Sequence, residues 1–472
     1  MTGKMPDLTG SIVTTEEGKR YKLDRIAGYG SQGVVYEDVD AGKMIKFYYP
    51  SESDEVDEDI YDRLRFIHNI ALPKNFVGVE SLIDTPYIGY VMQKVVDHKP
   101  LNSYLIPDKD TSFSEWYNKD MGLRGRIFVG YIIAKAFGEL EQKNLSYCDI
   151  SGNNILVRLG KKASVRMIDV DNIYVAGRGA ASVIGTPRYI APEVISRQKN
   201  PDVLSDNYSL AVILFELLRV GHPYISDDIL DGTPEDEENA LAGRYDYVTD
   251  ANSTNMLPAD IVLTTKLSEL FRKCFVDGKK NRMARPSALE FEYALLDASN
   301  KVIKCPSCGA WHYPRKKGRN YEGCPWCDAE SKPAARLNFY DILFDGKDYR
   351  TGEHVGEEKN GKLVNTYILR EGKNMIKNMY VLRYDDGSKD GGFAGNFFTI
   401  AKDTRGYWAY NEFSRKGIAL RHYSSGRYEE IGANKAVKLE NGDCIYFEMN
   451  IVINVGGKDY SFIRMARFIE EA

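Results

Sequence analysis

The pattern of apolar and polar residues changes period along the chain. Over residues 21–47, short strand-like apolar runs alternate with turn sequences such as AGYGSQG and DVDAGK, which predicts a small β-rich region. Apolar residues then recur at helical spacing over residues 124–140 and again over 208–218. A predominantly helical region is therefore expected after the β-rich one.

The last third of the chain has a different character. After Asn300 the sequence becomes rich in Cys, Pro, Lys, Arg and Gly, and after Arg336 it becomes rich in Tyr, Gly and Asn. Residues 445–455 alternate apolar and polar side chains as a half-buried strand does, and Gly456-Gly457 predicts a hairpin turn. These shifts predict three domains, covering residues 1–300, 301–334 and 335–472.

Length and charge limit the function. A chain of 472 residues with 43% hydrophobic residues is long enough for two to four globular domains. The net charge of -5 gives no electrostatic reason for the whole chain to bind nucleic acid. No apolar run approaches the ~18 residues that span a bilayer, and the start MTGKMPDLTG has no apolar signal core. We therefore expect a cytoplasmic protein without membrane contact.

Three glycines lie between two strand-like runs in AGYGSQGVVY. Gly28, Gly30 and Gly33 follow the pattern G-x-G-x-x-G, and the chain continues as a strand through Val35. A dinucleotide-binding fold would need a helix after the last glycine, so the strand favours a loop that covers the phosphates of a nucleotide. Lys46, in MIKFYY, has the position of a fixed cation for the α and β phosphates of ATP.

Two further motifs place polar groups next to apolar runs. In LSYCDISGNNILV, the D-x-x-x-x-N spacing of Asp149 and Asn154 puts a catalytic carboxylate near a nucleophilic hydroxyl and an amide oxygen near a metal ion. In VRMIDVDNI, Asp169 is expected to supply the second metal ligand. The pattern therefore predicts Mg²⁺ held by Asn154 and Asp169.

With IGTPRYIAPEV following, these motifs resemble, in order, those of the protein kinase superfamily over roughly residues 20–297. The resemblance implies a bilobal α+β fold, with a small lobe over about residues 15–92 and a large lobe over about 96–300. It also implies that Met92 is the gatekeeper of the nucleotide pocket. The chain looks like a bacterial Hanks-type (eukaryotic-like) Ser/Thr protein kinase.

The resemblance assigns further residues of the large lobe. It implies that Asp206 braces the catalytic loop and that Arg285 pairs with Glu193. Ser182 and Thr186 fall in the activation segment, where they are candidate autophosphorylation sites, although an exposed loop hydroxyl is the commoner explanation.

Several positions depart from the family pattern. Tyr147-Cys148 replaces the usual His-Arg before Asp149, so the cation that receives an activation-loop phosphate is missing. The usual Phe-Gly after Asp169 is Val170-Asp171. The Asp-Ile-Ser-x-x-Asn motif also resembles that of small-molecule kinases of the aminoglycoside phosphotransferase type. The Gly-Thr-x-x-Tyr-x-Ala-Pro-Glu segment resembles that of enzymes that act on proteins.

The acidic partner of Lys46 is not fixed by the motifs. The spacing typical of the family leads to Arg65, with Glu58 and Asp62 as the nearby acidic candidates. Of these two, Asp62 is the expected partner.

The four cysteines of CPSCGAWHYPRKKGRNYEGCPWC have the spacing C-x₂-C-x₁₅-C-x₂-C. Two such pairs complete a tetrahedral shell around Zn²⁺, which predicts a structural zinc ribbon with the ligands Cys305, Cys308, Cys324 and Cys327. Two disulfides are the alternative, and a reducing compartment disfavours them. The cations Arg315, Lys316, Lys317 and Arg319 lie between the pairs, yet such a cluster is usually only solvated, so nucleic acid is not an expected partner.

Residues 335–472 are long enough for an all-β sandwich and a connector. Their landmarks resemble those of a forkhead-associated (FHA) domain, which would imply a phosphoprotein or regulatory partner. Lys377 stands where that family has a phosphate-binding arginine, with Asn411 and Ser414 near the second binding loop. Lysine lacks the bidentate fork of arginine, so a purely structural sandwich is an equal alternative.

The sequence therefore predicts an ATP- and Mg²⁺-dependent kinase that phosphorylates Ser and Thr of protein substrates, itself included. Kinases of this type act in signalling, including stress and defence. Two alternatives remain: a catalytically silent scaffold, and a small-molecule kinase.

Overall fold

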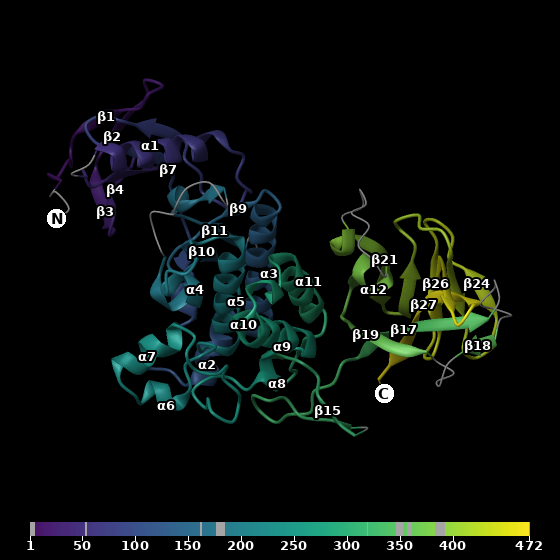
Figure 1. Cartoon of the computed structure of the whole chain (residues 1–472). Helices are drawn as coiled ribbons and strands as arrows, with labels where there is room; N and C mark the ends of the chain where they lie inside the picture. The colour runs from purple at the N-terminus through teal and green to yellow at the C-terminus, as the bar shows by residue number, and fades with distance from the viewer. Residues whose placement is uncertain are drawn as a thin grey trace. The chain divides into compact units, whose positions relative to one another are not determined.

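In a computed structural model of the chain, the described residues are 5–51, 54–160, 163–175, 185–318, 320–345, 353–355, 361–382 and 392–471. The chain forms two compact units, Met1–Leu295 and Leu296–Ala472 (Figure 1). The first unit has a small lobe built on an antiparallel sheet and a helical large lobe, and the second unit is rich in strands. The predicted domains 301–334 and 335–472 both lie in the second unit.

The small lobe of the first unit contains a sheet with the strand order β3-β4-β5-β7-β6 and antiparallel neighbours. Alternate residues of each strand face opposite sides of the sheet. Val34, Tyr36, Ile45 and Phe47 pack on the side that also buries Val13 of the hairpin β1–β2. The elements are β1 (Ile12–Thr14), β2 (Arg20–Lys22), β3 (Arg25–Tyr29), β4 (Gly33–Asp38), β5 (Lys43–Tyr48), α1 (Asp54–Asn69), β6 (Ser81–Ile83) and β7 (Gly89–Gln93).

The large lobe is built around two helices that contact each other, α3 (Gly122–Glu141) and α5 (Val203–Arg219). α5 is buried from Ser205 to Arg219, and a capping box of Asp202 and Ser205 begins it. Both helices confirm the predictions over residues 124–140 and 208–218. The remaining helices are α2 (Phe113–Lys119), α4 (Pro192–Ile195), α6 (Asp227–Leu230), α7 (Pro234–Leu241), α8 (Ala259–Val262), α9 (Thr265–Arg272), α10 (Gly278–Lys280) and α11 (Ala288–Ser299).

Short strands and turns of the large lobe carry its loops. The strands are β8 (Lys99–Pro100), β9 (Leu145–Ser146), β10 (Ile155–Arg158), β11 (Ser164–Met167) and β12 (Tyr174–Val175). The short helical turns are η1 (Leu101–Tyr104), η2 (Val170–Asn172), η3 (Pro187–Tyr189), η4 (Lys273–Asp277) and η5 (Arg282–Ala284). β10 and β11 pair, so the segments after Asp149 and before Asp169 lie side by side.

The second unit begins with the last turn of α11, and the hairpins β13 (Ile303–Lys304)–β14 (Trp311–His312) and β15 (Lys316–Lys317)–β16 (Asn320–Tyr321) follow it. Two larger sheets follow. One contains β17 (Ala335–Asp345), β18 (Glu353–Val355), β19 (Lys362–Leu369), β23 (Ile418–Arg421), β24 (Tyr428–Glu430), β26 (Cys444–Val455) and β27 (Lys458–Glu470). The other contains β20 (Lys373–Lys377), β21 (Asn396–Asp403), β22 (Gly406–Tyr410) and β25 (Ala436–Leu439), and the short elements α12 (Asn378–Val381) and η6 (Gly392–Ala394) complete the unit.

A shared core joins the two larger sheets. Phe339, Phe447 and Phe468 of one sheet pack in the same buried cluster as Ile400 and Ala409 of the other. This is the β-sandwich expected from the sequence. The β26–β27 hairpin confirms the predicted final strand and turns at Gly456-Gly457. Among the described helices, none combines the length and the hydropathy that a bilayer crossing requires.

Candidate active site

The strand register of the small lobe brings four residues into one row across the sheet. Gly28 pairs with Val35, Val35 with Lys46, and Lys46 with Tyr90. Met92 lies two residues after Tyr90 and thus on the same side of the sheet. Tyr90 is fully buried and Lys46 is 7% exposed. Gly28, Val35, Lys46 and Met92 therefore share the side of the sheet opposite the apolar core.

The three glycines differ in how much space their neighbours leave for a side chain. A Cβ on Gly33 would lie 1.9 Å from the carbonyl oxygen of Phe47, so the close approach of β4 to β5 excludes any side chain there. Among the described residues, a Cβ on Gly28 would meet no atom within 4 Å, and one on Gly30 would touch the Gly33 carbonyl at 3.7 Å. The packing of β4 against β5 explains Gly33, whereas the described neighbours of Gly28 and Gly30 leave room for a side chain.

The predicted catalytic loop places Asp149, Asn154 and Thr186 in contact. The Asn154 amide donates to the Asp149 carboxylate at 3.0 Å and to its carbonyl oxygen at 2.9 Å. The hydroxyl and the backbone N–H of Thr186 donate to Asp149 Oδ1 at 2.8 and 2.9 Å. An aliphatic hydroxyl is therefore already bound by the predicted catalytic carboxylate. Ser182, the other predicted phosphorylation site, lies outside the described residues.

Lys46 is held by two carboxylates from a single turn. Its Nζ lies 2.7 Å from Asp171 Oδ2 and 3.3 Å from Asp169 Oδ1. The Tyr48 hydroxyl donates to the same oxygen of Asp171. Burial alone would lower the pKa of Lys46, but the charges of Asp171 and Asp169 raise it above its ordinary value. The ammonium group therefore stays charged inside the lobe.

The expected pairing of Lys46 with Asp62 is wrong. Among the described residues, the ion pairs of Lys46 join it to Asp169 and Asp171, and neither carboxylate comes from α1. Glu58 and Asp62 are exposed and line a pocket with Asp57, Tyr61, Asp84 and Ile88. The helical phase explains the difference, because Leu64 and Ile67 face the core and turn the acidic side of α1 away from it.

The sequence motifs assign no role to Asp171, which stands where the family has a glycine. A second carboxylate two residues after Asp169 in an apolar run is the signal in the sequence that points to it. In the structure the side chain is fully buried. Burial raises the pKa of Asp171, but the charge of Lys46 and the hydrogen bonds from Lys46 and Tyr48 outweigh it and lower that pKa.

The predicted bracing contacts of the large lobe are confirmed. The Asp206 carboxylate accepts hydrogen bonds from the backbone N–H groups of Tyr147 and Cys148 and from the Ser146 hydroxyl. Arg285 binds both oxygens of Glu193 at 2.7 Å. These contacts fix the backbone on both sides of the candidate site.

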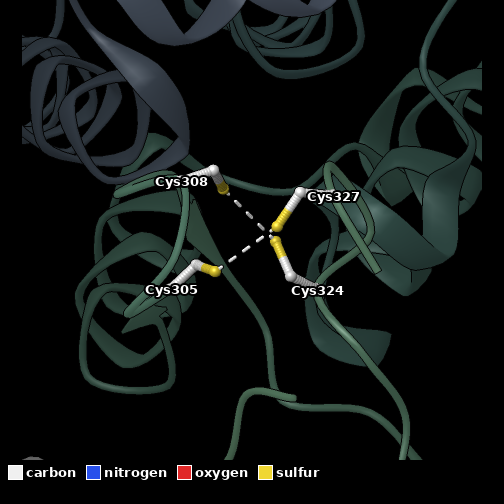
Figure 2. Close-up of side chains that lie close together, drawn as sticks. All are labelled: Cys305, Cys308, Cys324 and Cys327. Atoms are coloured by element: carbon white, nitrogen blue, oxygen red, sulfur yellow. Dashed lines mark hydrogen bonds between the residues drawn. The ribbon is translucent and has the colours of Figure 1, made fainter. Parts of the chain in front are cut away.

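The four clustered cysteines meet at one point in the second unit (Figure 2). The sulfurs of Cys305 and Cys327 are 3.7 Å apart, and those of Cys308 and Cys324 are 3.8 Å apart. Four sulfurs placed tetrahedrally at about 2.3 Å from one ion would be about 3.8 Å from one another. The donor set and its spacing therefore fit a single Zn²⁺.

The surroundings shift the pKa values of the cluster in both directions, because burial raises those of Cys308 and Cys324 while that of Cys305 is lowered. Burial raises the pKa of Cys305, but the backbone N–H groups of Cys308 and Ser307 outweigh it and lower that pKa to about 7. Nearby cations already have partners in the same unit. Lys316 lies over the Tyr321 ring and 3.7 Å from Glu471, and Arg315 lies 3.3 Å from Glu322.

The FHA-like landmarks of the second unit lie at neighbouring positions. Lys377 donates to the side-chain oxygen of Asn396 at 2.7 Å, and Arg415 donates to the Asn396 carbonyl at 3.2 Å. Asn411 is fully buried and bonds to the backbone of Arg415 and Ile431. Ser414 has a left-handed φ of 51°. Asn411 thus braces the loop, while Lys377 and Arg415 converge on Asn396.

Comparison with known proteins supports one family. Residues 21–294 match the family described as "Protein kinase domain". A cGMP-dependent protein kinase of Eimeria tenella is 29% identical over 184 residues, or 38% of this chain and 18% of that protein. Serine/threonine-protein kinase D3 of Homo sapiens is 25% identical over 217 residues, or 43% of this chain and 23% of that protein.

A third relative matches a shorter segment. The cGMP-dependent protein kinase, isozyme 2 forms cD5/T2, of Drosophila melanogaster is 34% identical over 103 residues, or 21% of this chain and 11% of that protein. The matches thus span between 11 and 23% of the length of these three relatives.

Proposed function

The chain belongs to the protein kinase family, and on this premise we propose that it transfers the γ-phosphoryl group of ATP to Ser or Thr hydroxyls of proteins, itself included. The observation that carries the proposal is the contact between Asp149 and the Thr186 hydroxyl at 2.8 Å. A β-hydroxyl bound in this way has its proton directed at a carboxylate that accepts it during transfer. The proposed role of such an enzyme is in signalling.

The residues present fit a nucleotide and its metal. Asp169 offers a carboxylate, and Asn154 directs its amide N–H to Asp149, so its side-chain oxygen remains an acceptor. Oxygen ligands of this kind are those that Mg²⁺ prefers. When bound, Mg²⁺ neutralises charge on the phosphates. Lys46 is proposed to bind the α and β phosphates, and Gly28 and Gly30 to admit them beneath β3 and β4.

Val35 and Met92 are proposed to contact the base of the nucleotide. Both lie on the side of the sheet that carries Lys46, and Met92 is 7% exposed. Their apolar side chains would exclude water from this end of the site. The free energy of binding would come from burial of the base, while Lys46 and the glycines orient the phosphates.

Labelling of the purified chain and of a generic protein substrate with γ-labelled ATP and Mg²⁺ tests the proposal. We expect incorporation by the natural protein and its loss in Asp149→Ala. Undiminished labelling in this variant would refute the role of Asp149. Nucleotide binding without turnover would favour the scaffold alternative, and labelling of an added aminoglycoside but no protein would favour the small-molecule alternative.

For the second unit we propose one structural Zn²⁺ bound by the four cysteines. The spacing of the sulfurs supports this proposal, and four protein ligands leave no open position for catalysis. Metal analysis of the purified chain should give one zinc per chain. A preparation that is folded and free of zinc would refute it.

For the β-sandwich we propose a phosphoprotein or regulatory partner. The convergence of Lys377 and Arg415 on Asn396 supports an anionic ligand at this edge. Titration with a phosphothreonine peptide and its unphosphorylated form should show preference for the phosphopeptide. Equal affinities would leave the sandwich with a structural role only.

A further inference from the structure

The counter-ion of Lys46 comes from the turn that follows Asp169. Asp171 Oδ2 accepts a hydrogen bond from Lys46 at 2.7 Å and another from the Tyr48 hydroxyl. Lys46 and Tyr48 are two residues apart on β5, so their side chains lie on the same side of the sheet. The fully buried Asp171 carboxylate therefore accepts hydrogen bonds from two side chains of the same strand.

The helix α1 was expected to supply a carboxylate next to Lys46, but it supplies a cation, Arg63, near Asp171. α1 contacts the short turn η2, which contains Asp171. Arg63 lies on α1, and its side chain interacts with the Tyr48 hydroxyl that donates to Asp171. The Asp171 carboxylate thus lies in the field of a cation on β5 and a cation on α1. An added carboxylate on α1 would compete with Asp171 for Lys46.

We propose that Asp171 is the positioning residue of Lys46, replacing an acidic residue of α1. The inference rests on the proposed phosphoryl transfer. Because Asp169 and Asp171 belong to the same turn, one segment both supplies a metal ligand and orients the phosphate-binding cation. The position of the metal ligand Asp169 and the position of Lys46 then depend on the same short turn. Lys46 can therefore be oriented without a movement of α1.

A double-mutant cycle on the full chain tests the assignment. The dissociation constant of Mg²⁺–ATP is measured for the natural protein, Asp171→Asn, Lys46→Met and the double variant. Asp171→Asn removes the closer of the two carboxylates that hold Lys46, and Lys46→Met removes the phosphate-binding cation itself, so each single substitution should weaken binding about 30-fold. The double variant should bind no more weakly than Lys46→Met, because Asp171 acts through Lys46. Asp62→Asn, in the exposed acidic face of α1, is the control and should bind as the natural protein does.

Kinetics distinguish positioning from a general structural role. In Asp171→Asn the KM for ATP should rise by the same factor as the dissociation constant, while the KM for the protein substrate stays unchanged. Natural-like binding by Asp171→Asn, or losses that multiply in the double variant, would overturn the assignment. A natural protein without ATP turnover would overturn the proposed function, whereas turnover insensitive to Asp171→Asn would overturn the assignment of Asp171 alone.

Unfolding provides a second test if Asp171→Asn fails to fold. The double variant leaves neither charge of the pair uncompensated, so its melting temperature should recover toward that of the natural protein. A double variant that melts below both single variants would overturn the pairing.

Discussion

The site around Lys46 and the cysteine cluster are assembled in opposite ways. The four cysteines fall within residues 305–327, and two short turns bring their sulfurs together. Lys46, Asp149 and Asp171 come from a strand and two loops that only the packing of both lobes brings together. In a local motif, the sequence spacing of the residues determines how their side chains meet. In a dispersed site, the sequence spacing does not determine the orientation of the side chains.

Removal of one cysteine should give the largest effect and leave the dispersed site intact. Cys308→Ser breaks the proposed Zn²⁺ shell, and structural zinc contributes about 10–16 kcal/mol in zinc-finger peptides. We expect loss of zinc and a large fall in the melting temperature of the second unit, measured by metal analysis and calorimetry. Affinity for Mg²⁺–ATP should be unchanged.

Cys444→Ser is the matched control for this experiment. Cys444 is a buried cysteine of the same unit and lies outside the cluster. This variant should retain its zinc. Equal zinc content in Cys308→Ser and Cys444→Ser would contradict the cluster as a metal site.

The glycines of the small lobe allow a smaller and more local test of the dispersed site. In Gly33→Ala the new Cβ would lie 1.9 Å from the Phe47 carbonyl, so the strands must separate. We expect a loss of about 2–3 kcal/mol in the free energy of unfolding, measured by denaturant titration.

Gly28→Ala separates ligand binding from folding. Its Cβ would meet no atom within 4 Å in the described part of the chain, so stability should change little. The KM for ATP should nevertheless rise, because the methyl group occupies space proposed for a phosphate. Equal destabilisation by Gly28→Ala and Gly33→Ala would refute the view that packing requires a glycine only at position 33.

The smallest expected effect concerns pH and the first unit. His222 is buried and neutral, with the Tyr224 N–H donating to Nδ1 and Nε2 facing the Arg188 carbonyl at 3.0 Å. Burial lowers its pKa well below 6.5. Below pH 6.5 the unfolded chain therefore binds a proton that the folded chain does not, and stability falls as the pH falls.

His222→Gln should reduce this slope, which for one group is at most about 1.4 kcal/mol per pH unit. Unfolding free energies of the first unit between pH 7 and pH 5 provide the measurement. The second unit, which contains its own buried His312, should keep its pH dependence. Identical slopes for the natural protein and His222→Gln would contradict a neutral buried His222.

The sequence was informative where chemistry and local geometry coincide. The helices α3 and α5, the final hairpin and the meeting of four cysteines follow from periodicity or from short motifs, whereas the Arg285–Glu193 pair follows from the resemblance to protein kinases. Whether Asp62 or Asp171 faces Lys46 depends on the phase of α1 and the course of η2. Leu64 and Ile67 pack inward and set the phase of α1, and the spacing of the acidic residues does not encode that packing.

Identification of the phosphorylated residue type tests the central claim most directly. The natural protein is incubated with γ-labelled ATP, Mg²⁺ and a generic protein substrate, and the labelled amino acids are identified after hydrolysis beside Asp149→Ala. The account predicts phosphoserine and phosphothreonine from the natural protein and no label above background from Asp149→Ala. Label in phosphotyrosine alone, or equal label from Asp149→Ala, would contradict it.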